Sequence, residues 1–508
     1  MEPVSSTPAA TLDAAPPTTD AAVRPLGLGT KLAYGAGSIA FGIKDNGFST
    51  LLLLFYSQVV GLRADLVGLA IMIALVLDAF IDPVIGHVSD HTRSRWGRRH
   101  PYMYAAAIPI GLLYVLLWTP PRGDQVVTMA YLIVVSVLVR TAISAYEVPS
   151  AALAPELTQD YHERTSVIGY RYLFGWIGGM GMLLLTFAVL LAPTPAYPVG
   201  QLNPAGYRDY AVIAATLMTA AILLSAFGTQ RRIAALPRPV VTRTSLAGTL
   251  RGVRTALGNQ AFRTLLLAGV FGFTAQGLTF ALSTYFNTFF WGLPASILAL
   301  SVTLTIAGVI LAFALAAQVS RRVGKRGAAA AMTLAYPVVA ILPYLGRLAG
   351  VLPANGDPWL LAILGASVLV ATALGVGGGI LSASMMADVV EDAQTRTGER
   401  TEGLFFAGSF FMQKCVSGLG VFLSGAILAL VGFPAGAVPG SVPAAVLTHL
   451  VLIYCAGLMT FAAIAAWFLA RFPLGGESDH RERLAALARA AARAAPLPAS
   501  EPELQTFR

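Results

Sequence analysis

The stretch Asp78-Ala-Phe-Ile-Asp-Pro-Val-Ile-Gly-His-Val-Ser-Asp-His-Thr-Arg-Ser-Arg-Trp-Gly-Arg-Arg99 passes from an apolar segment with two carboxylates into a cluster of arginines. The apolar run that leads into it, residues 65–88, has the length of about 20 residues that an α-helix needs to cross the hydrocarbon core of a membrane. A cluster of arginines directly after such a run is typical of a cytoplasmic loop. The stretch therefore predicts a charged membrane-spanning helix followed by a cytoplasmic loop.

The composition extends this interpretation to the whole chain. Of its 508 residues, 56% are hydrophobic and only 12% are charged, whereas soluble domains carry roughly a quarter charged residues. The net charge of +9 does not indicate nucleic acid, because the basic residues stand in short clusters between apolar runs. The composition excludes a soluble protein and predicts the lipid bilayer as the surroundings of most of the chain.

The same length criterion predicts twelve membrane-spanning helices in two halves. Their ranges are 32–58, 65–88, 102–119, 127–155, 168–192, 209–228, 263–288, 295–318, 328–347, 359–387, 403–432 and 445–471. Lysine and arginine gather in the loops after the second, sixth and eighth spans, which predicts cytoplasmic termini. A glycine followed by two cations recurs as Gly97-Arg-Arg99 and Gly324-Lys-Arg326, which indicates a weak internal repeat.

This repeat predicts the domain organisation. We expect a disordered tail over 1–26, a six-helix bundle over 27–228, a basic linker over 229–262, a second six-helix bundle over 263–472, and a tail over 473–508 that contains an amphipathic helix. The fold class is thus an all-α membrane protein.

Ionisable residues inside the spans are costly and therefore indicate function. Asp78 and Asp82 are four residues apart, so both carboxylates face one side of the second span. Their charges repel each other, which favours uptake of a proton or binding of a cation between them; alternatively, Asp82 only organises a helix end before Pro83. Lys414, inside the eleventh span, needs a counter-ion, and the acidic second span is the natural candidate. With the hydroxyl of Ser144, these residues form the predicted coupling-ion site.

The fourth and fifth spans carry the predicted substrate site. Glu147 stands in Tyr146-Glu-Val-Pro149, seven residues after Arg140, and Arg171 opens the fifth span. Glu147 either binds substrate hydroxyls or forms a structural ion pair with Arg140 or Arg171. Arg171 either meets a substrate oxygen or holds Glu147, or it is an arginine that extends its charged end to the membrane interface. Further substrate candidates, each with packing, local pairing or helix–helix hydrogen bonding as the alternative, are Lys44, Asp45, Arg140, Tyr146, Trp176 and Gln276.

Signals of other function classes are missing from the sequence. It contains no phosphate-binding Gly-x-x-x-x-Gly-Lys-Ser/Thr motif, so ATP is not expected to drive it directly. No His, Cys or Glu cluster has the spacing of metal ligands. We therefore expect neither an enzyme nor a cofactor besides the coupling ion.

These motifs resemble the glycoside–pentoside–hexuronide:cation symporters, the melibiose-carrier branch of the major facilitator superfamily. The resemblance rests on Lys31-Leu-Ala-Tyr-Gly35, Asp78–Gly86, Thr92–Arg98, Tyr146–Pro155 and Gly403–Lys414. It implies twelve helices in two six-helix bundles that rock around a central site. It also implies a gating loop made of Arg93, Arg95, Gly97 and Arg98.

The resemblance also implies roles for individual residues. Asp78 and Asp82 match the family's cation-site aspartates, and they would ligate a metal ion only if the ion is sodium. Glu147 matches a substrate-site aspartate, Arg171 an arginine that lines the cavity, and Lys414 a lysine near the cation site. The sequence departs from the melibiose carrier at two positions: Ile81 replaces an asparagine ligand of sodium, and Gly42 replaces a sugar-binding aspartate.

The sequence thus predicts a symporter of a sugar, glycoside or sugar acid in a bacterial inner membrane. Ile81 favours protons over sodium as the coupling ion. One alternative is a carrier of a lysolipid or another amphiphile on the same fold, and a second is a membrane sensor or scaffold that transports nothing. We expect a monomer whose partners are the solute, the coupling cation and the bilayer, with no nucleic acid.

Overall fold

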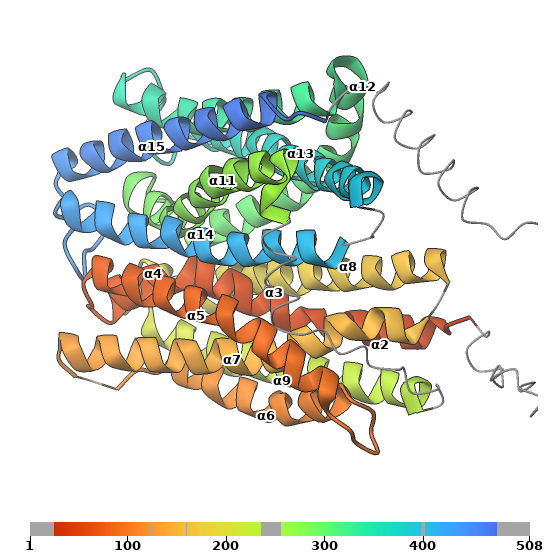
Figure 1. Ribbon diagram of the computed structural model, residues 1–508. Coiled ribbons are helices and arrows are strands. Elements are labelled where there is room, and N and C mark those ends of the chain that lie inside the picture. Colours follow the sequence, from red (N-terminus) through yellow and green to blue (C-terminus); the bar gives the residue numbers. More distant parts are fainter. Residues whose placement is uncertain (1–24, 122, 159, 235–255, 398–401, 475–508) are drawn as a thin grey trace, which may run out of the picture.

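The computed structural model describes residues 25–121, 123–158, 160–234, 256–397 and 402–474. All regular structure in these ranges is helical, and ten helices are long and apolar enough to cross a membrane. Most of the helices lie side by side with their long axes roughly parallel (Figure 1). An all-α membrane protein is therefore confirmed.

The first half of the chain begins with an interrupted helix. Its parts are α2 (Leu28–Ala36), α3 (Ser38–Asn46), a π-helical turn (Gly47–Leu51), α4 (Leu52–Leu54) and a second π-helical turn (Phe55–Val59). The helices that follow are α5 (Ala64–His91), α6 (His100–Leu117), α7 (Gln125–Leu157), α8 (Tyr161–Leu185), extended by a π-helical turn over Thr186–Leu190, and α9 (Pro204–Ala234).

The described residues of the second half form five helices. They are α11 (Gln260–Tyr285), extended by a π-helical turn over Phe286–Phe290, α12 (Ala295–Leu348), α13 (Pro358–Thr397), α14 (Glu402–Leu430) and α15 (Ala444–Ala470). A straight helix of 54 residues would measure about 80 Å, far more than the roughly 30 Å of the hydrocarbon core. Gly324 interrupts α12 with a non-helical backbone (φ 73°, ψ 161°). The two arms of α12 correspond to the two spans predicted over 295–318 and 328–347, so the helices agree with the twelve expected spans.

The domain boundaries stay a prediction. The tails lie largely outside the described residues, as does the amphipathic helix expected after residue 473. Within the expected linker, α9 continues to Ala234 and α11 begins at Gln260.

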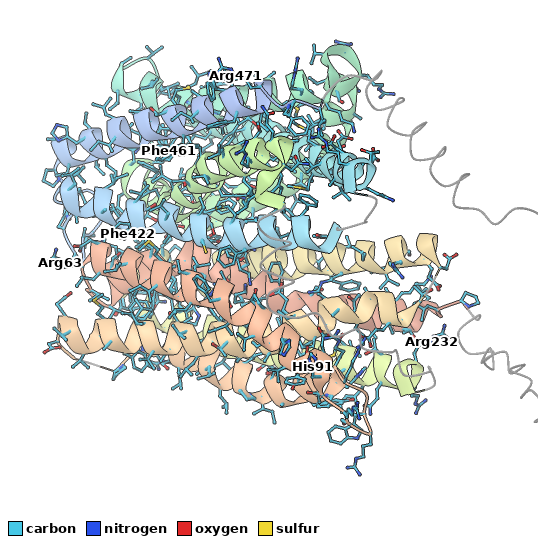
Figure 2. All side chains as sticks on the ribbon, viewed as in Figure 1. Arg63, His91, Arg232, Phe422, Phe461 and Arg471 are labelled. Carbon is cyan, nitrogen blue, oxygen red and sulfur yellow. The ribbon has the colours of Figure 1, made fainter. Side chains whose placement is uncertain are left out.

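We call the face with the loops after α5 and around Gly324 the basic face, and the other end of the bundle the opposite face. Arg232, at the end of α9, and Arg63, before α5, lie towards these two ends, respectively (Figure 2).

Spans 1 and 7 each end in the same kind of turn, which we call a corner and which the sequence analysis did not predict. Residues 55–62 and 286–293 each begin with a π-helical turn and end in Gly-Leu. The glycines, Gly61 (φ 90°) and Gly292 (φ 61°), adopt the left-handed conformation that favours glycine. The two corners occupy equivalent positions at the opposite face, which supports the two-half organisation.

Glycines let helices of the two halves approach closely. Gly68 of α5 faces the backbone of Val421 and Phe422 in α14, so that an added Cβ would lie 3.0 Å from the Val421 carbonyl oxygen. Small residues at such crossings are the usual means of packing membrane helices. As a result α14 of the second half lies against α5 of the first (Figure 1), which places Lys414 opposite the two aspartates.

Candidate functional site

Asp78 is the centre of a buried charge cluster. Its side chain is only 2% exposed, and three donors reach it. Arg140 Nη2 donates to Oδ2 over 2.8 Å, Ser144 Oγ donates to Oδ1 over 2.7 Å, and Lys414 Nζ lies 3.0 Å from Oδ2. Both oxygens of Asp78 are therefore occupied, by groups from α7 of the first half and α14 of the second.

Asp82 lies one turn further along α5 and is bonded on one side only. Its Oδ2 accepts a short hydrogen bond from Lys414 Nζ, whereas its buried Oδ1 has no hydrogen-bond partner among the residues that the structure describes. α5 continues through Pro83 to His91, so Asp82 does not organise a helix end, and that alternative is wrong. The expected shared face of Asp78 and Asp82 and their pairing with Lys414 are confirmed.

Arg140 belongs to this cluster rather than to a separate substrate site. Its side chain is 2% exposed, and the guanidinium lies 5.2 Å from the ring centre of Phe48. Two cations, Arg140 and Lys414, thus face two carboxylates in a region of low polarity. Breaking one side of such a buried pair leaves an unpaired charge and costs about 3–5 kcal/mol, so the cluster strongly favours a matched charge count.

Glu147 and Arg171 lie near each other without forming an ion pair. Arg171 donates from Nη1 to Ser150 Oγ over 3.0 Å and from Nη2 to the Glu147 backbone carbonyl over 3.5 Å. No cation of the described chain lies within 4.0 Å of the Glu147 carboxylate. The structure therefore does not contain the ion pair with Arg140 or Arg171 that the alternative required, and the half-buried carboxylate of Glu147 contacts no cation of the described residues within 4.0 Å in this conformer.

The aromatic candidates differ in their surroundings. Tyr146 is 2% exposed, and its hydroxyl lies against Gly37, where an added Cβ would come within 1.7 Å of it. That contact fits the packing alternative. Trp176 on α8 is 44% exposed, so its ring is not buried in the packing of the bundle.

Lys44 and Asp45 form the expected local pair, with 3.7 Å between Nζ and Oδ1. Lys44 is 2% exposed and lies over the ring of Phe41, whereas the Asp45 side chain is 59% exposed. Gln276 of α11 is also exposed, and within the described ranges no hydrogen bond ties it to a neighbouring helix. Asp45 and Gln276 are therefore available to a ligand.

At the basic face, the predicted gating loop is only partly engaged. Arg98 pairs with Glu156 at 2.7 Å and Gly97 has φ 87°, whereas Arg93 and Arg95 are exposed. The sequence reasoning missed Arg99, which is buried and bridges Asp90, Glu156 and Ser89. The second half has a counterpart in the Lys325–Asp388 pair at 2.9 Å. The signal for both was an acidic residue near the basic-face end of an apolar span, about four turns from the centre of that span.

Neutral hydrogen bonds join the two halves at the opposite face. The hydroxyls of Ser57 and Tyr285 share a short hydrogen bond, and Thr284 Oγ1 donates to the Thr50 carbonyl over 3.0 Å. Gln201 Nε2 donates to the Leu293 carbonyl over 2.8 Å, and the Ala437 amide donates to Gln58 Oε1 over 2.9 Å. These four contacts, which we call the latch, tie the corner of span 1 to that of span 7 and to the neighbouring loops.

Comparisons with known proteins agree on one kind of protein. The family model described as MFS/sugar transport protein matches residues 33–476. An uncharacterized symporter of Synechocystis sp. is 30% identical over 479 residues, covering 81% of this chain and 87% of that protein. The isoprimeverose transporter of Lactiplantibacillus pentosus is 26% identical over 416 residues, covering 80% of this chain and 81% of that protein.

A solved structure supports the fold. The D-xylose-proton symporter matches with a TM-score of 0.62 and 14% identity, covering 87% of this chain and 97% of that chain. At this identity the likeness concerns the fold alone, and it bears out the expected arrangement.

Proposed function

We propose, from the premise that this chain belongs to the MFS/sugar transport protein family, that it carries a sugar, a glycoside or a sugar acid across the membrane together with a proton. The chain is a multi-pass secondary transporter with the major facilitator fold and is not an enzyme. The observation that carries the proposal is the contact of Lys414, from the second half, with both Asp78 and Asp82 of the first.

Coupling follows from the unequal bonding of the two aspartates. Asp78 has no free oxygen, whereas Oδ1 of Asp82 is buried and unbonded. A proton that binds to Asp82 removes one of the two charges that hold Lys414, which weakens the contact between the halves. Ion occupancy thereby changes the relative energies of the conformers in which the halves meet differently at the centre.

The ligands around Asp82 favour a proton over sodium. A hard cation such as sodium requires several oxygen ligands, but Ser144 and two cations occupy both oxygens of Asp78. The neighbouring Ile81 offers no side-chain oxygen. A proton needs only the single free oxygen of Asp82.

Substrate binding is assigned to side chains that are exposed or that contact no cation within 4.0 Å. The carboxylate of Glu147 accepts hydrogen bonds from hydroxyl groups, and Arg171 supports it through the Glu147 carbonyl and Ser150. Asp45 and Gln276 add exposed polar groups, and Trp176 adds an exposed ring. The name of the isoprimeverose transporter, a relative over most of the chain, supports a sugar-like solute.

Alternating access requires that the latch and the central contact open and close in turn. In this conformer the latch joins the halves at the opposite face. The Arg98–Glu156 and Lys325–Asp388 pairs of the basic face each lie within one half. We therefore assign this conformer to the state closed at the opposite face, and the basic arginines support a cytoplasmic location of the basic face.

The test is uptake into liposomes that contain the purified protein. A panel of radiolabelled pentoses, hexoses, glycosides and sugar acids is presented with an imposed pH gradient, a sodium gradient or neither. Accumulation of at least one of these solutes under the pH gradient supports the proposal. Accumulation of a lysolipid alone would support an amphiphile carrier, and transport of no solute by a folded protein would support a sensor or scaffold.

A further inference from the structure

A pocket lies at the opposite face, away from the charge cluster. It is a cavity of about 330 Å³ where the turn after α11, the end of α12, the following loop and the start of α15 meet. Its lining includes Phe290, Arg347, Asn355, Ala444, Leu447 and Thr448. None of these residues takes part in the proposed coupling or substrate site.

Arg347 is an incompletely satisfied cation in this pocket. Nη2 donates to Asn355 Oδ1 over 2.5 Å, and the guanidinium lies 5.5 Å from the ring centre of Trp291. Its Nε is buried and has no hydrogen-bond partner in the described part of the chain. Within the same residues no carboxylate lies within 4.0 Å of the guanidinium. The nearby Asp357 caps α13 by accepting from the Trp359 amide over 2.8 Å.

The other polar groups of the wall are also hydrogen-bond donors. Ala444 is the first residue of α15, whose N-cap, Pro443, provides no side-chain hydrogen bond to the first-turn amides. Such amides and the helix dipole attract an anion. Thr448, one turn further along, adds a hydroxyl, and Phe290 and Leu447 add apolar surface. The Val446 and Leu447 amides donate to the Pro443 carbonyl, so the amides of Ala444 and Ala445 remain for a ligand. Together with the guanidinium and a hydroxyl beside apolar side chains, they match an oxyanion that is attached to an apolar group.

We propose that this pocket binds a phosphate group, supplied by an anionic phospholipid of the leaflet at the opposite face. The forked donors of arginine suit phosphate oxygens, and the pocket lies at the ends of three helices that are long and apolar enough to cross a membrane. Free phosphate in solution offers the same chemistry without the apolar part. The proposal stands independently of the transported solute and the coupling ion.

Asn355 connects the pocket to the latch, so a ligand bound in the pocket would affect the latch through this side chain. The Asn355 side chain accepts from Arg347 and donates from Nδ2 to the Phe290 carbonyl over 3.1 Å. Phe290 ends the π-helical turn that leads to Leu293, whose carbonyl accepts the hydrogen bond from Gln201 in the other half. A phosphate that holds Arg347 in place thereby stabilises the corner on which the closed opposite face depends.

The test measures the melting temperature of the full-length protein in detergent while phosphatidylglycerol, phosphatidylcholine, inorganic phosphate or sulfate is added. We expect phosphatidylglycerol to raise the melting temperature of the wild type and phosphatidylcholine to have little effect. Arg347→Gln should weaken the half-maximal response to phosphatidylglycerol about tenfold or more, because a charge-assisted contact is lost. The matched control is Arg471→Gln, since Arg471 also lies over a tryptophan ring, 3.8 Å from the centre of Trp467, but at the other end of α15.

Each possible result of these measurements either supports or refutes the proposed phosphate site. An equal response to inorganic phosphate would assign the pocket to a soluble anion instead of a lipid and overturn the lipid source. An unchanged lipid response in Arg347→Gln, or an equal loss in Arg471→Gln, would overturn the site. If Arg347→Gln does not fold, Thr448→Val takes its place, because this substitution removes only one hydroxyl of the pocket. Native mass spectrometry then counts the phosphatidylglycerol molecules bound to Thr448→Val. A count equal to that of the wild type would also refute the site.

Discussion

Replacing each of the two aspartates by asparagine should separate charge balance from ion coupling. Asp78→Asn removes the partner of Arg140, and both side chains are 2% exposed. The guanidinium then remains buried without its counter-charge, which costs about 3–5 kcal/mol of the free energy of unfolding. Asp82→Asn leaves Lys414 with its 3.0 Å contact to Asp78, so its cost should be about 1 kcal/mol, that of one hydrogen bond.

Both variants should lose accumulation driven by a pH gradient, because each removes a charge of the cluster that Lys414 contacts. Only Asp78→Asn should lower the melting temperature of the purified protein by several degrees. Adding Arg140→Gln to Asp78→Asn restores the charge count and should recover most of the melting temperature but none of the accumulation. Such a pair of residues in contact is expected to be strongly non-additive.

The assay is differential scanning fluorimetry and liposome uptake on the same four preparations: wild type, the two single variants and the double variant. If Asp78→Asn melts like the wild type, the matched charge count is not what stabilises the cluster. If Asp82→Asn accumulates solute as the wild type does, the free oxygen of Asp82 is not the proton site, and the coupling scheme is refuted.

Three further predictions concern the other parts of the protein. Glu147→Gln should weaken solute binding roughly ten- to a hundredfold, since charged hydrogen bonds contribute about 1.5–3 kcal/mol; calorimetry with an unchanged affinity and a much lower melting temperature would make Glu147 a structural residue. Uptake should follow an imposed pH gradient at constant sodium, and a strict sodium requirement without proton movement would contradict the role given to Ile81. Glu163 lies before the span Ser166–Leu190; burial disfavours its ionised form, but hydrogen bonds from Thr158, Lys31 and the Leu26 amide outweigh this and lower the pKa of its carboxyl. The stability that Glu163 provides should therefore be present above its unfolded-state pKa and lost as the pH falls towards the lowered value. Melting temperatures of Glu163→Gln measured against pH should lack this loss.

The central cluster could be predicted because the cost of buried charge is a local property of the sequence. Two carboxylates four residues apart share a face, and a lone lysine in an apolar span needs a counter-ion, so their meeting follows from energy alone. The partner of Arg140 could not be predicted in the same way. Its spacing to Glu147 fixes their common side on α7 but not which neighbouring helix that side faces. The contact with Asp78 depends on the packing of α5 against α7.

Gly42 shows why the reason for a sequence difference can require the structure. In the resemblance to the melibiose carrier, this position replaces a carboxylate that binds sugar. Here an added Cβ at Gly42 would lie 1.9 Å from the carbonyl oxygen of Gly175, so α3 and α8 are too close for any side chain. The position serves helix packing. The exposed carboxylate on this span, Asp45, lies three residues further on, next to Lys44.

The two contacts between the halves have energies of the same order, which is what a transport cycle requires. The latch consists of four neutral hydrogen bonds, each of which contributes about 0.5–1.5 kcal/mol. Losing the contact of Lys414 with both aspartates costs about 3–5 kcal/mol, of which the hydrogen bond to Asp82 accounts for about 1 kcal/mol. Moving a two-state equilibrium from one conformer to the other requires a differential of about 5.5 kcal/mol. A single proton on Asp82 acts on the charged contact alone and supplies about 1 kcal/mol of this differential, so solute binding must supply the rest.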